Sequence, residues 1–588
     1  MKEKIIFGIN LSHNMSCAVV IGGKVVVAIE EERLNRVKYC WGVTIYGKII
    51  PYRSINYCCN YLGIKAKDVD LFVVNSCEPH SGRQALIEQL IGIDEDKIIE
   101  VTEPGHHLAH AFSSFYCSPF SEAAIVTIDV NGSHTKDGIE NYSIHHGSAK
   151  GIVLKQNDLI KRGEIGIGEL YVLYAALLQL SPEKGSVNGA DNALASGGKL
   201  MGYASYDKRS FEERTEILDH LWKGRTGSKM TIKLASLVEL FACRGLVEKT
   251  SDVNPERLHA WEAKKLLPWK YRKSSLHEED NMKLAGEAQA VLESSILKVV
   301  DFAYEATKSE NLCVAGGTML NVVACTKILK KTAFKNLFVQ PASTDAGIAI
   351  GAAMFGFYNH LKETKRYYLE NDYSTLLGKT YSQEEIDDVF KMNWNGSFRH
   401  YKVEEEDQQI AILCKFLCDE KVVTLFKGRS EFGPRALGSR SFLASPLSPG
   451  MVDRMNVIKS REWYRPVAPL ILEEDFNEWF DAPFERSPFM TMAAGCKEKT
   501  KKMAPSICHV DGTARPQTIS KKNNPFLHKL LVEFKKKTGV PILINTSFNL
   551  RDPIVESPME AVNTIVQNKG IDLLILENYI IEPNGNSH

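Results

Sequence analysis

The 588-residue sequence lacks several features that would have placed it in a class at once. It contains 13 cysteines but no C-x-x-C pair, which argues against a zinc ribbon and favours reduced thiols over a disulfide framework. No apolar run approaches the roughly 20 residues needed to span a bilayer. The apolar stretch before Gly8 is too short for a signal peptide. We therefore expect a cytoplasmic location and no membrane partner.

The sequence also lacks net charge. Lys+Arg and Asp+Glu both total 72, so nothing attracts the whole chain to nucleic acid, and any anion site must be local. The hydrophobic content of 44% and the charged content of 24% are those of an ordinary globular protein. A chain of this length is expected to form two or more domains.

Strand-like and helix-like segments alternate along the chain, which predicts an α/β fold. The segments KIIFGIN (4–10), DLFVVNS (70–76) and AAIVTIDV (123–130) are predicted strands, and Gly22-Gly23 predicts a hairpin. Residues 311–329 and 336–358 each have the pattern strand, turn, helix, and residues 171–180 predict a buried helix. Residues 205–280 are charged and helix-prone, as in an insertion or lid. We place a domain boundary near residue 375, in a polar connector.

The histidines are concentrated in EPGHHLAHAFSSF (103–115). If Pro104-Gly105 opens a helix, His106 and His110 share one face, a spacing that can hold a metal. Asp129 and Asp345 follow predicted strands and could supply oxygen ligands. The spacing alone does not select this interpretation, since Asp345 could cap a helix, Asp129 could begin a turn, and the histidines could be ordinary core residues.

A second concentration is basic. Eight Lys and Arg residues lie between positions 427 and 465, opposed by only three acids. They are set among glycine, proline and apolar residues, and burying their charges without partners would cost free energy. A small anion such as phosphate or a carboxylate could pair with them. Distant acids of the protein could do the same. HVDGTARPQT (509–518) and GVPILINTSFNLRDPIV (539–555) could complete such a pocket, or could simply form turns.

These motifs together carry a resemblance. GRSEFGPRALGSRS, KSREWYRP, VDGTARPQT and TGVPILINTSFN occur in this order, after LSHNMSCAVVIGGKVVVAIEEERLNRVK, HHLAHAFSSF and CVAGGTMLN. The chain thereby resembles, from about residue 5 to 580, the O-carbamoyltransferases of natural-product biosynthesis, the family of the tobramycin, cephamycin and nodulation-factor enzymes.

The resemblance implies an actin-like (ASKHA) domain at 1–375, with a helical insertion at about 205–280, packed on a YrdC-like domain at 376–588. The second domain would make carbamoyl-adenylate from carbamoyl phosphate and ATP with Mg²⁺. The first would transfer the carbamoyl group to a hydroxyl of a small molecule, such as an antibiotic, a toxin or a sugar, beside a divalent metal, commonly iron. We expect no nucleic acid partner, and a homodimer is left open.

The resemblance also implies roles for single residues. The metal ligands would be His106, His110, Asp129 and Asp345, and the catalytic residues would be His107 and His13, the latter as general base. The adenylate would lie against Gly316, Gly317 and Asn321. Carbamoyl phosphate and ATP would be bound by Lys427, Arg435, Arg440, Arg461, Arg465, Arg515, Asn545 and Ser547.

The chain departs from the family pattern at Asn14, Ser133 and Ser205, where Asp, Glu and Pro are usual. The alternative function is that of the enzymes that attach threonylcarbamoyl to tRNA, which the zero net charge disfavours. The hydrogenase-maturation carbamoyltransferases carry C-x-x-C zinc fingers that are lacking here. A non-catalytic nucleotide sensor on an actin-like scaffold would need neither the clustered cations nor a metal set.

Overall fold

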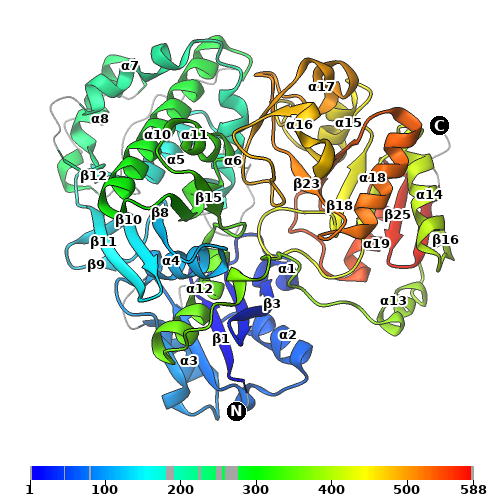
Figure 1. Ribbon diagram of the computed structural model, residues 1–588, viewed down its shortest axis with the longest axis horizontal. Coiled ribbons are helices and arrows are strands. Elements are labelled where there is room, and N and C mark those ends of the chain that lie inside the picture. Colours follow the sequence, from blue (N-terminus) through cyan, green and yellow to red (C-terminus); the bar gives the residue numbers. More distant parts are fainter. Residues whose placement is uncertain are drawn as a thin grey trace. The chain divides into compact units, whose positions relative to one another are not determined.

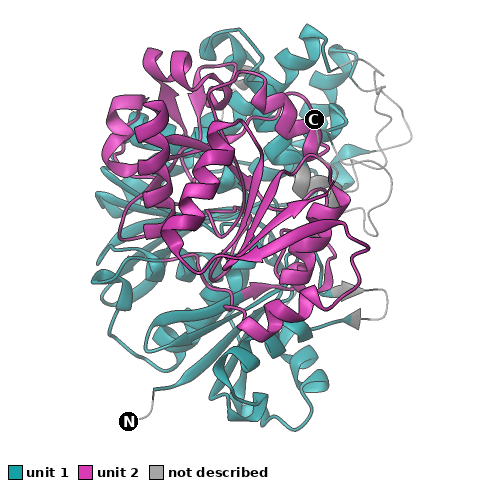
Figure 2. Ribbon diagram, turned by 90° about the vertical axis from the view of Figure 1, so that its right-hand side faces the viewer, with its two compact units in different colours: residues 1–28, 39–373 teal, residues 29–38, 374–588 magenta. Residues whose placement is uncertain are grey.

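The structure is a computed structural model that describes residues 3–44, 47–77, 81–180, 191–222, 227–246, 254–258 and 276–584. Two compact units make up the chain (Figure 2). Unit 1 comprises residues 1–28 and 39–373, and unit 2 comprises residues 29–38 and 374–588. A ten-residue segment near the N-terminus therefore folds with the C-terminal part, an exchange that the sequence did not indicate.

The first sheet of unit 1 has five strands in the order β3-β2-β1-β6-β7. β1 is antiparallel to β2 and parallel to β6, and β6 is parallel to β7. The predicted hairpin at Gly22-Gly23 joins β2 to β3, and both glycines have positive φ. The strands are β1 (Ile5–Asn10), β2 (Ser16–Ile21), β3 (Lys24–Glu30), β6 (Leu71–Asn75) and β7 (Ile98–Glu100).

The second sheet of unit 1 repeats this arrangement, with the order β11-β10-β8-β14-β15. β8 is again antiparallel to one neighbour, β10, and parallel to the other, β14. Two sheets with the same strand order and directions form the duplicated architecture of an actin-like domain, so the predicted α/β and actin-like fold is confirmed. The strands are β8 (Ala123–Ile128), β10 (Gly138–Ser148), β11 (Gly151–Ile160), β14 (Asn311–Ala315) and β15 (Asn336–Val339), with β9 (His134–Thr135) paired to β10.

Two helices of unit 1 pack on each other, each against its own sheet (Figure 1). α4 (Gly105–Cys117) contacts β8 and β14, and α12 (Ile348–Met354) contacts β1 and β2. A Cβ atom on Gly351 of α12 would lie 1.8 Å from the carbonyl oxygen of Ala109 in α4, so only glycine permits this approach. α4 opens after Pro104, as predicted, and carries the histidine cluster.

The remaining helices of unit 1 include the long α10 (Glu279–Thr307), which contacts α5, α6, α7 and α11. Within the predicted insertion the described residues are mainly helical, and residues 259–275 lie outside the described ranges. In those ranges no helix combines the length and the apolar character needed to cross a bilayer. The helices are α2 (Tyr52–Leu62), α3 (Ser81–Gln89), α5 (Ile167–Leu177), α6 (Asp191–Ala204), α7 (Phe211–Trp222), α8 (Leu234–Cys243) and α11 (Val322–Lys331).

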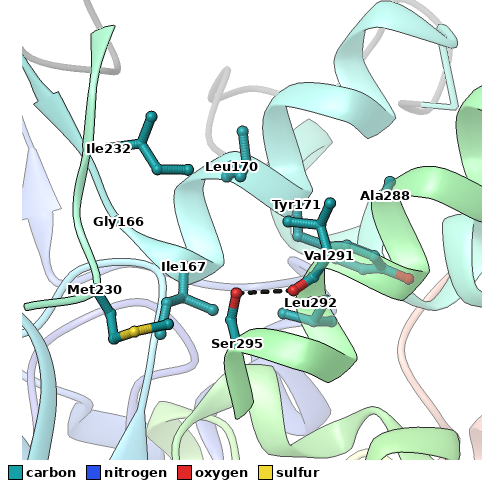
Figure 3. A pocket seen from close by; sticks show the side chains of 10 residues that line it. All are labelled: Gly166, Ile167, Leu170, Tyr171, Met230, Ile232, Ala288, Val291, Leu292 and Ser295. Carbon is teal, nitrogen blue, oxygen red and sulfur yellow. Dashed lines mark hydrogen bonds between the residues drawn. The ribbon is translucent and has the colours of Figure 1, made fainter. Parts of the chain in front are cut away.

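A small cavity lies where α5 and α10 meet the segment around Met230 and Ile232 (Figure 3). Its walls are mostly apolar. The hydroxyl of Ser295 donates a hydrogen bond to the carbonyl oxygen of Val291 in its own helix. Residues 205–280 therefore contribute part of an apolar wall, and no predicted site residue lines this cavity.

Unit 2 contains a mixed eight-stranded sheet in the order β16-β26-β25-β17-β18-β24-β19-β23. β17/β25 and β19/β23 are parallel pairs, and the other neighbouring pairs are antiparallel. The YrdC-like assignment and the packing of the two domains stay predictions. The strands are β16 (Phe398–Lys402), β17 (Val423–Phe426), β18 (Arg440–Ala444), β19 (Ala468–Leu472), β23 (Gln517–Ile519), β24 (Ile542–Ser547), β25 (Leu573–Leu576) and β26 (Tyr579–Pro583).

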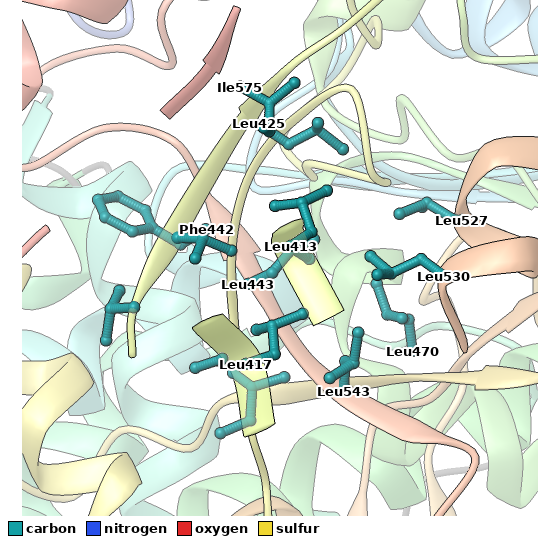
Figure 4. Packing of buried hydrophobic residues seen from close by; sticks show 14 of the residues in the cluster. Leu413, Leu417, Leu425, Phe442, Leu443, Leu470, Leu527, Leu530, Leu543 and Ile575 are labelled. Carbon is teal, nitrogen blue, oxygen red and sulfur yellow. The ribbon is translucent and has the colours of Figure 1, made fainter. Parts of the chain in front are cut away.

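The core of unit 2 is built by this sheet and two helices that pack on each other (Figure 4). Leu413 and Leu417 come from α14 (Glu406–Cys418), and Leu530 comes from α18 (Pro525–Thr538). Strand side chains such as Leu443 and Leu543 complete the cluster. The other helices of unit 2 are α1 (Glu31–Asn35), α13 (Gln383–Phe390), α15 (Met451–Ile458), α16 (Phe476–Trp479), α17 (Glu498–Met503) and α19 (Pro558–Gln567).

The packing of this core predicts the effect of a truncation. Leu530 is fully buried, so Leu530→Ala removes buried methyl groups and leaves a cavity, lowering the free energy of unfolding of unit 2 by about 2–5 kcal/mol. Urea denaturation measures the change. Val457→Ala, at a side chain that is 78% exposed, is the control and should change it by less than about 0.5 kcal/mol. Equal losses in the two variants would contradict the assignment of this core.

Candidate metal centre and anion site

Four buried side chains converge in unit 1. His106 and His110 lie one turn apart on α4, Asp129 follows β8, and Asp345 begins a short 3-10 helix before α12. One ligand atom from each lies within 4.8 Å of the other three. The Nε2 atom of His110 is 3.3 Å from Oδ2 of Asp129 and 3.6 Å from Oδ1 of Asp345. The structure thus brings together all four predicted ligands.

The four converging atoms lack hydrogen-bond partners. They are Nε2 of His106, Nε2 of His110, Oδ2 of Asp129 and Oδ1 of Asp345, and all are buried. Buried polar atoms are normally paired, so four such atoms facing one point are the pattern expected of a cation site. Two imidazoles and two carboxylates form a donor set that fits a divalent transition metal.

Neighbouring groups orient the ligands from behind. The hydroxyl of Ser12 donates a 2.5 Å hydrogen bond to Oδ2 of Asp345, and the backbone N–H of Val130 donates to Oδ1 of Asp129. The thiol of Cys77 lies 3.5 Å from Nδ1 of His106. In Asp345, Asp129 and His106, one polar atom of the side chain thus has a neighbour in the protein, while the atom that faces the other ligands has no hydrogen-bond partner. Outer-shell groups around a bound metal commonly orient its ligands in this way.

The electrostatics of the four residues keep the carboxylates charged. Burial raises the pKa of Asp129 and Asp345, but the facing histidines outweigh burial and hold both pKa values below the usual range. Both side chains are therefore anionic at neutral pH, as metal ligands must be.

The two predicted catalytic histidines have different positions. Nε2 of His13 is 3.3 Å from Oδ2 of Asp345, and its side chain is 21% exposed, so it borders the metal centre. Both ring nitrogens of His107 lie away from the four atoms, with Nδ1 3.9 Å from Glu140 and Nε2 beneath Gly132. Burial lowers the pKa of His107 to about 4. The structure therefore does not bring His107 to the centre, and a packing role fits its position better than catalysis.

The predicted adenylate-binding residues lie beside the metal centre or in a polar network. Gly316 has a positive φ, and a Cβ atom on Gly317 would lie 3.2 Å from Oδ1 of Asp129. Asn321 uses Oδ1 to accept the N–H of Ala324, capping α11, and pairs its amide with Gln289. Gly316 packs against the backbone of Ile128, and Gly317 lies beside Asp129. The amide of Asn321 has a structural role here.

Four of the predicted arginines in unit 2 form one cluster. The pKa of Arg515 is lowered well below its ordinary value by burial and by the charges of Arg435, Arg461 and Arg465. Burial and Arg465 lower the pKa of Arg461 in the same way. Arg465 has one carboxylate 3.6 Å away, that of Glu462. A bound anion would reduce the repulsion among these guanidinium groups.

Other predicted anion ligands are engaged by the protein. The Arg440 guanidinium stacks on Phe426, and its Nη1 donates to the carbonyl oxygens of Gly428 and Ser439. Its Nε and Nη2 are buried without a hydrogen-bond partner among the described residues. Lys427 donates to the amide oxygen of Gln409. Two further residues hold strand ends and turns in place: Asn545 donates to Ala436 and Gln517, and the hydroxyl of Ser547 donates to Asn549.

Several site residues escaped the sequence analysis. Ser12 and Cys77 lie behind candidate metal ligands. Buried Lys459 was counted among the eight basic residues of the segment 427–465, and it donates to the carbonyl oxygens of Ser547 and Asn549. Lys38 lies at the end of the segment 29–38 that belongs to unit 2. Burial lowers the pKa of Lys38, and the charges of Arg465 and Arg461 lower it further. Ser12, Lys38 and Lys459 belong to motifs that carry the resemblance, whereas Cys77 lies outside them.

Comparison with known families decides the identity. Residues 82–354 match the family described as Carbamoyltransferase N-terminus, and residues 414–583 match Carbamoyltransferase C-terminus. The chain belongs to the carbamoyltransferase family. The expected membership of the O-carbamoyltransferase family and the expected enzyme class are thereby confirmed. The metal centre lies in the part matched by the N-terminal family description, and the arginine cluster lies in the part matched by the C-terminal one.

Relatives of this carbamoyltransferase extend over most of its length. Nodulation protein NolNO of Sinorhizobium fredii is 29% identical over 97% of this chain and 79% of its own. Nodulation protein U of Rhizobium tropici is 26% identical over 93% of this chain and 91% of its own. Nodulation protein NolO of Bradyrhizobium diazoefficiens is 35% identical over 53% of this chain and 56% of its own.

Solved structures are more distant. HypF from T. kodakarensis has a TM-score of 0.34 and 13% identity, covering 63% of this chain and 49% of its own. A ROK family glucokinase from Streptomyces griseus has a TM-score of 0.26 and 11% identity, covering 59% of this chain and 98% of its own. The actin-like assignment of unit 1 rests on its strand order alone.

The convergence of four free ligand atoms predicts that His110→Ala removes a metal ligand. Bound divalent metal, measured by elemental analysis after dialysis, should fall from about one equivalent per chain to well below a half. His146→Ala is the control, because this histidine pairs with Glu122 away from the cluster. Unchanged metal content in His110→Ala would refute the ligand set.

The contact behind His106 predicts a role for Cys77. Removing the sulfur in Cys77→Ala should weaken Co²⁺ binding by about 10-fold, because outer-shell partners orient the imidazole, whereas Cys77→Ser should restore most of the affinity. Titration of the visible Co²⁺ absorption measures both. The control is Cys117→Ala, at the C-terminal end of the helix that carries His106, and it is expected to lower stability and leave Co²⁺ affinity unchanged. If Cys77→Ala binds Co²⁺ like the unaltered protein, Cys77 does not orient His106.

Proposed function

We propose that this carbamoyltransferase makes carbamoyl-adenylate from ATP and carbamoyl phosphate, and transfers the carbamoyl group to a hydroxyl of a small-molecule natural product. The observation that carries the proposal is the cluster of Arg435, Arg461, Arg465 and Arg515, whose mutual repulsion a bound anion would relieve. ATP and carbamoyl phosphate are both polyanions, and bringing them together requires dense positive charge.

The activation step explains why two phosphate-bearing substrates are needed. Nitrogen donation makes the carbamoyl carbon a poor electrophile, and a mixed anhydride with AMP is more reactive. Water converts carbamoyl phosphate to carbamate and phosphate. A carbamate oxygen then attacks the α-phosphorus of Mg²⁺-ATP, and pyrophosphate leaves. The arginine cluster would offset the negative charge that gathers on both phosphate groups.

The transfer step is assigned to unit 1. The acceptor oxygen attacks the carbamoyl carbon, AMP leaves with the bonding electron pair, and the hydroxyl proton passes to a base. His13 is the candidate base, because it is partly exposed and borders the centre through Asp345. A divalent cation held by His106, His110, Asp129 and Asp345 would supply Lewis-acid polarisation of an oxygen.

The cation and the acceptor complete the proposal. We propose Fe(II) as the resident metal, and the donor set also suits Mn(II) and Zn(II). The acceptor would be a small hydroxylated molecule rather than a nucleic acid, consistent with the zero net charge. A screen of acceptors with radiolabelled carbamoyl phosphate would identify the class.

The division of labour between the units predicts a selective loss. Arg435→Ala should lower pyrophosphate release from ATP and carbamoyl phosphate by at least about 100-fold, because an anion ligand is removed. Transfer from supplied carbamoyl-adenylate to an acceptor should remain within a few-fold. A coupled pyrophosphate assay and a radiolabel transfer assay measure the two steps.

The matched control for Arg435→Ala is Arg454→Ala. Arg454 belongs to the same basic segment but is bound to Asp572 at 3.0 Å, so its loss should leave pyrophosphate release nearly unchanged. Equal loss of both steps in Arg435→Ala, or no pyrophosphate from the unaltered protein, would contradict the proposed function.

A further inference from the structure

Unit 2 includes a segment that the chain supplies from its N-terminal end. Residues 29–38 contain the end of β3, the short helix α1 (Glu31–Asn35) and the residues that follow it. Arg33, the central residue of α1, is 1% exposed. Burying an arginine is costly unless its charge is paired and its hydrogen bonds are made, so its partners indicate what this segment does.

The partners of Arg33 lie in the turn that leads to Arg435. Its Nη2 donates to the carbonyl oxygen of Gly433 at 2.9 Å and to that of Glu431 at 3.3 Å. The neighbouring Glu30 accepts the backbone N–H of Gly433 at 2.6 Å and lies 3.7 Å from Nε of Arg33. Both polar groups of the Gly433 backbone are therefore held by side chains from residues 29–38.

The other side of the same turn is closed by one carboxylate. Oε1 of Glu431 accepts the backbone N–H groups of Leu437 and Ser439, at 2.7 and 2.6 Å. Arg435 lies between these two attachments, two residues after Gly433 and two before Leu437. The backbone that carries Arg435 is thus fixed on one side by Glu431 and on the other by Glu30 and Arg33.

We propose that Arg33 and Glu30 are positioning residues for the anion site, holding the 431–439 turn so that Arg435 faces the other guanidinium groups. This inference rests on the proposed function of the arginine cluster. Repulsion by Arg461 and Arg515 would favour movement of Arg435 away from them, and a rigid turn opposes that movement. The carbamoyl-adenylate-forming step would therefore depend on residues 29–38, although they precede most of unit 1 in the sequence.

A matched arginine on the same segment separates positioning from simple attachment. Arg36 caps α1 and donates to the carbonyl oxygens of Ile554 and Pro553, with Asp552 and Glu560 beside it. It binds the segment to unit 2 without contacting the 431–439 turn. Loss of either arginine should loosen α1, but only loss of Arg33 should disturb Arg435.

The test compares Arg33→Lys with Arg36→Lys in the full chain. A lysine keeps the charge, but it is shorter and has no second nitrogen that could stay beside Glu30 while the first donates to the two carbonyl oxygens. We expect Arg33→Lys to raise the KM for carbamoyl phosphate in pyrophosphate release by about 10-fold or more, with a smaller change in kcat, since weakened ground-state binding raises KM. Arg36→Lys should stay within about 2-fold, and similar losses of thermal stability are expected in both.

A second measurement does not depend on turnover. Calorimetric titration with inorganic pyrophosphate should show about 10-fold weaker binding to Arg33→Lys than to Arg36→Lys. If Arg33→Lys does not fold, Glu30→Gln combined with Arg33→Met removes both buried charges together and should show the same weakening. Pyrophosphate affinity and KM that match those of Arg36→Lys would overturn the inference. Lack of turnover by the unaltered protein would refute the proposed function but would leave the binding comparison intact.

Discussion

Charged and polar side chains that the fold holds close to one another are the constraint on which both candidate sites depend. In unit 1, two imidazole nitrogens and two carboxylate oxygens face one point with no hydrogen-bond partner. In unit 2, guanidinium groups lie close enough to lower one another's pKa. Each arrangement costs free energy in the folded protein. A cation bound in unit 1 and anions bound in unit 2 would offset that cost.

The architecture of each unit explains how such charges are held. In unit 1, α4 and α12 pack closely through Gly351, which brings the histidines of one helix near the aspartate that precedes the other. In unit 2, the arginine turn is held by Glu431 and by a segment from the far end of the chain. In both places a rigid, well-packed scaffold sets the positions of groups that would otherwise avoid one another.

Much of this was predictable from the sequence where the signal is local. The i,i+4 spacing of His106 and His110 and the positions of Asp129 and Asp345 after strands indicated that these side chains could converge, because helix and strand geometry fix those directions. The choice of a metal site came from the family resemblance and stays a prediction. Roles that depend on long-range contacts were not predictable. His107 proved to face Glu140, Asn321 to cap α11, and Arg33 to join a turn about 400 positions away, since no spacing within the sequence encodes such contacts.

The central claim is that ATP is cleaved between its α- and β-phosphates to activate the carbamoyl group. Phosphorus-31 NMR of the protein with ATP, Mg²⁺ and carbamoyl phosphate tests it most directly. The account predicts inorganic phosphate and pyrophosphate in equal amounts, together with carbamoyl-adenylate or the AMP formed from it. Formation of ADP without pyrophosphate would indicate phosphoryl transfer from the γ-position and would contradict the account.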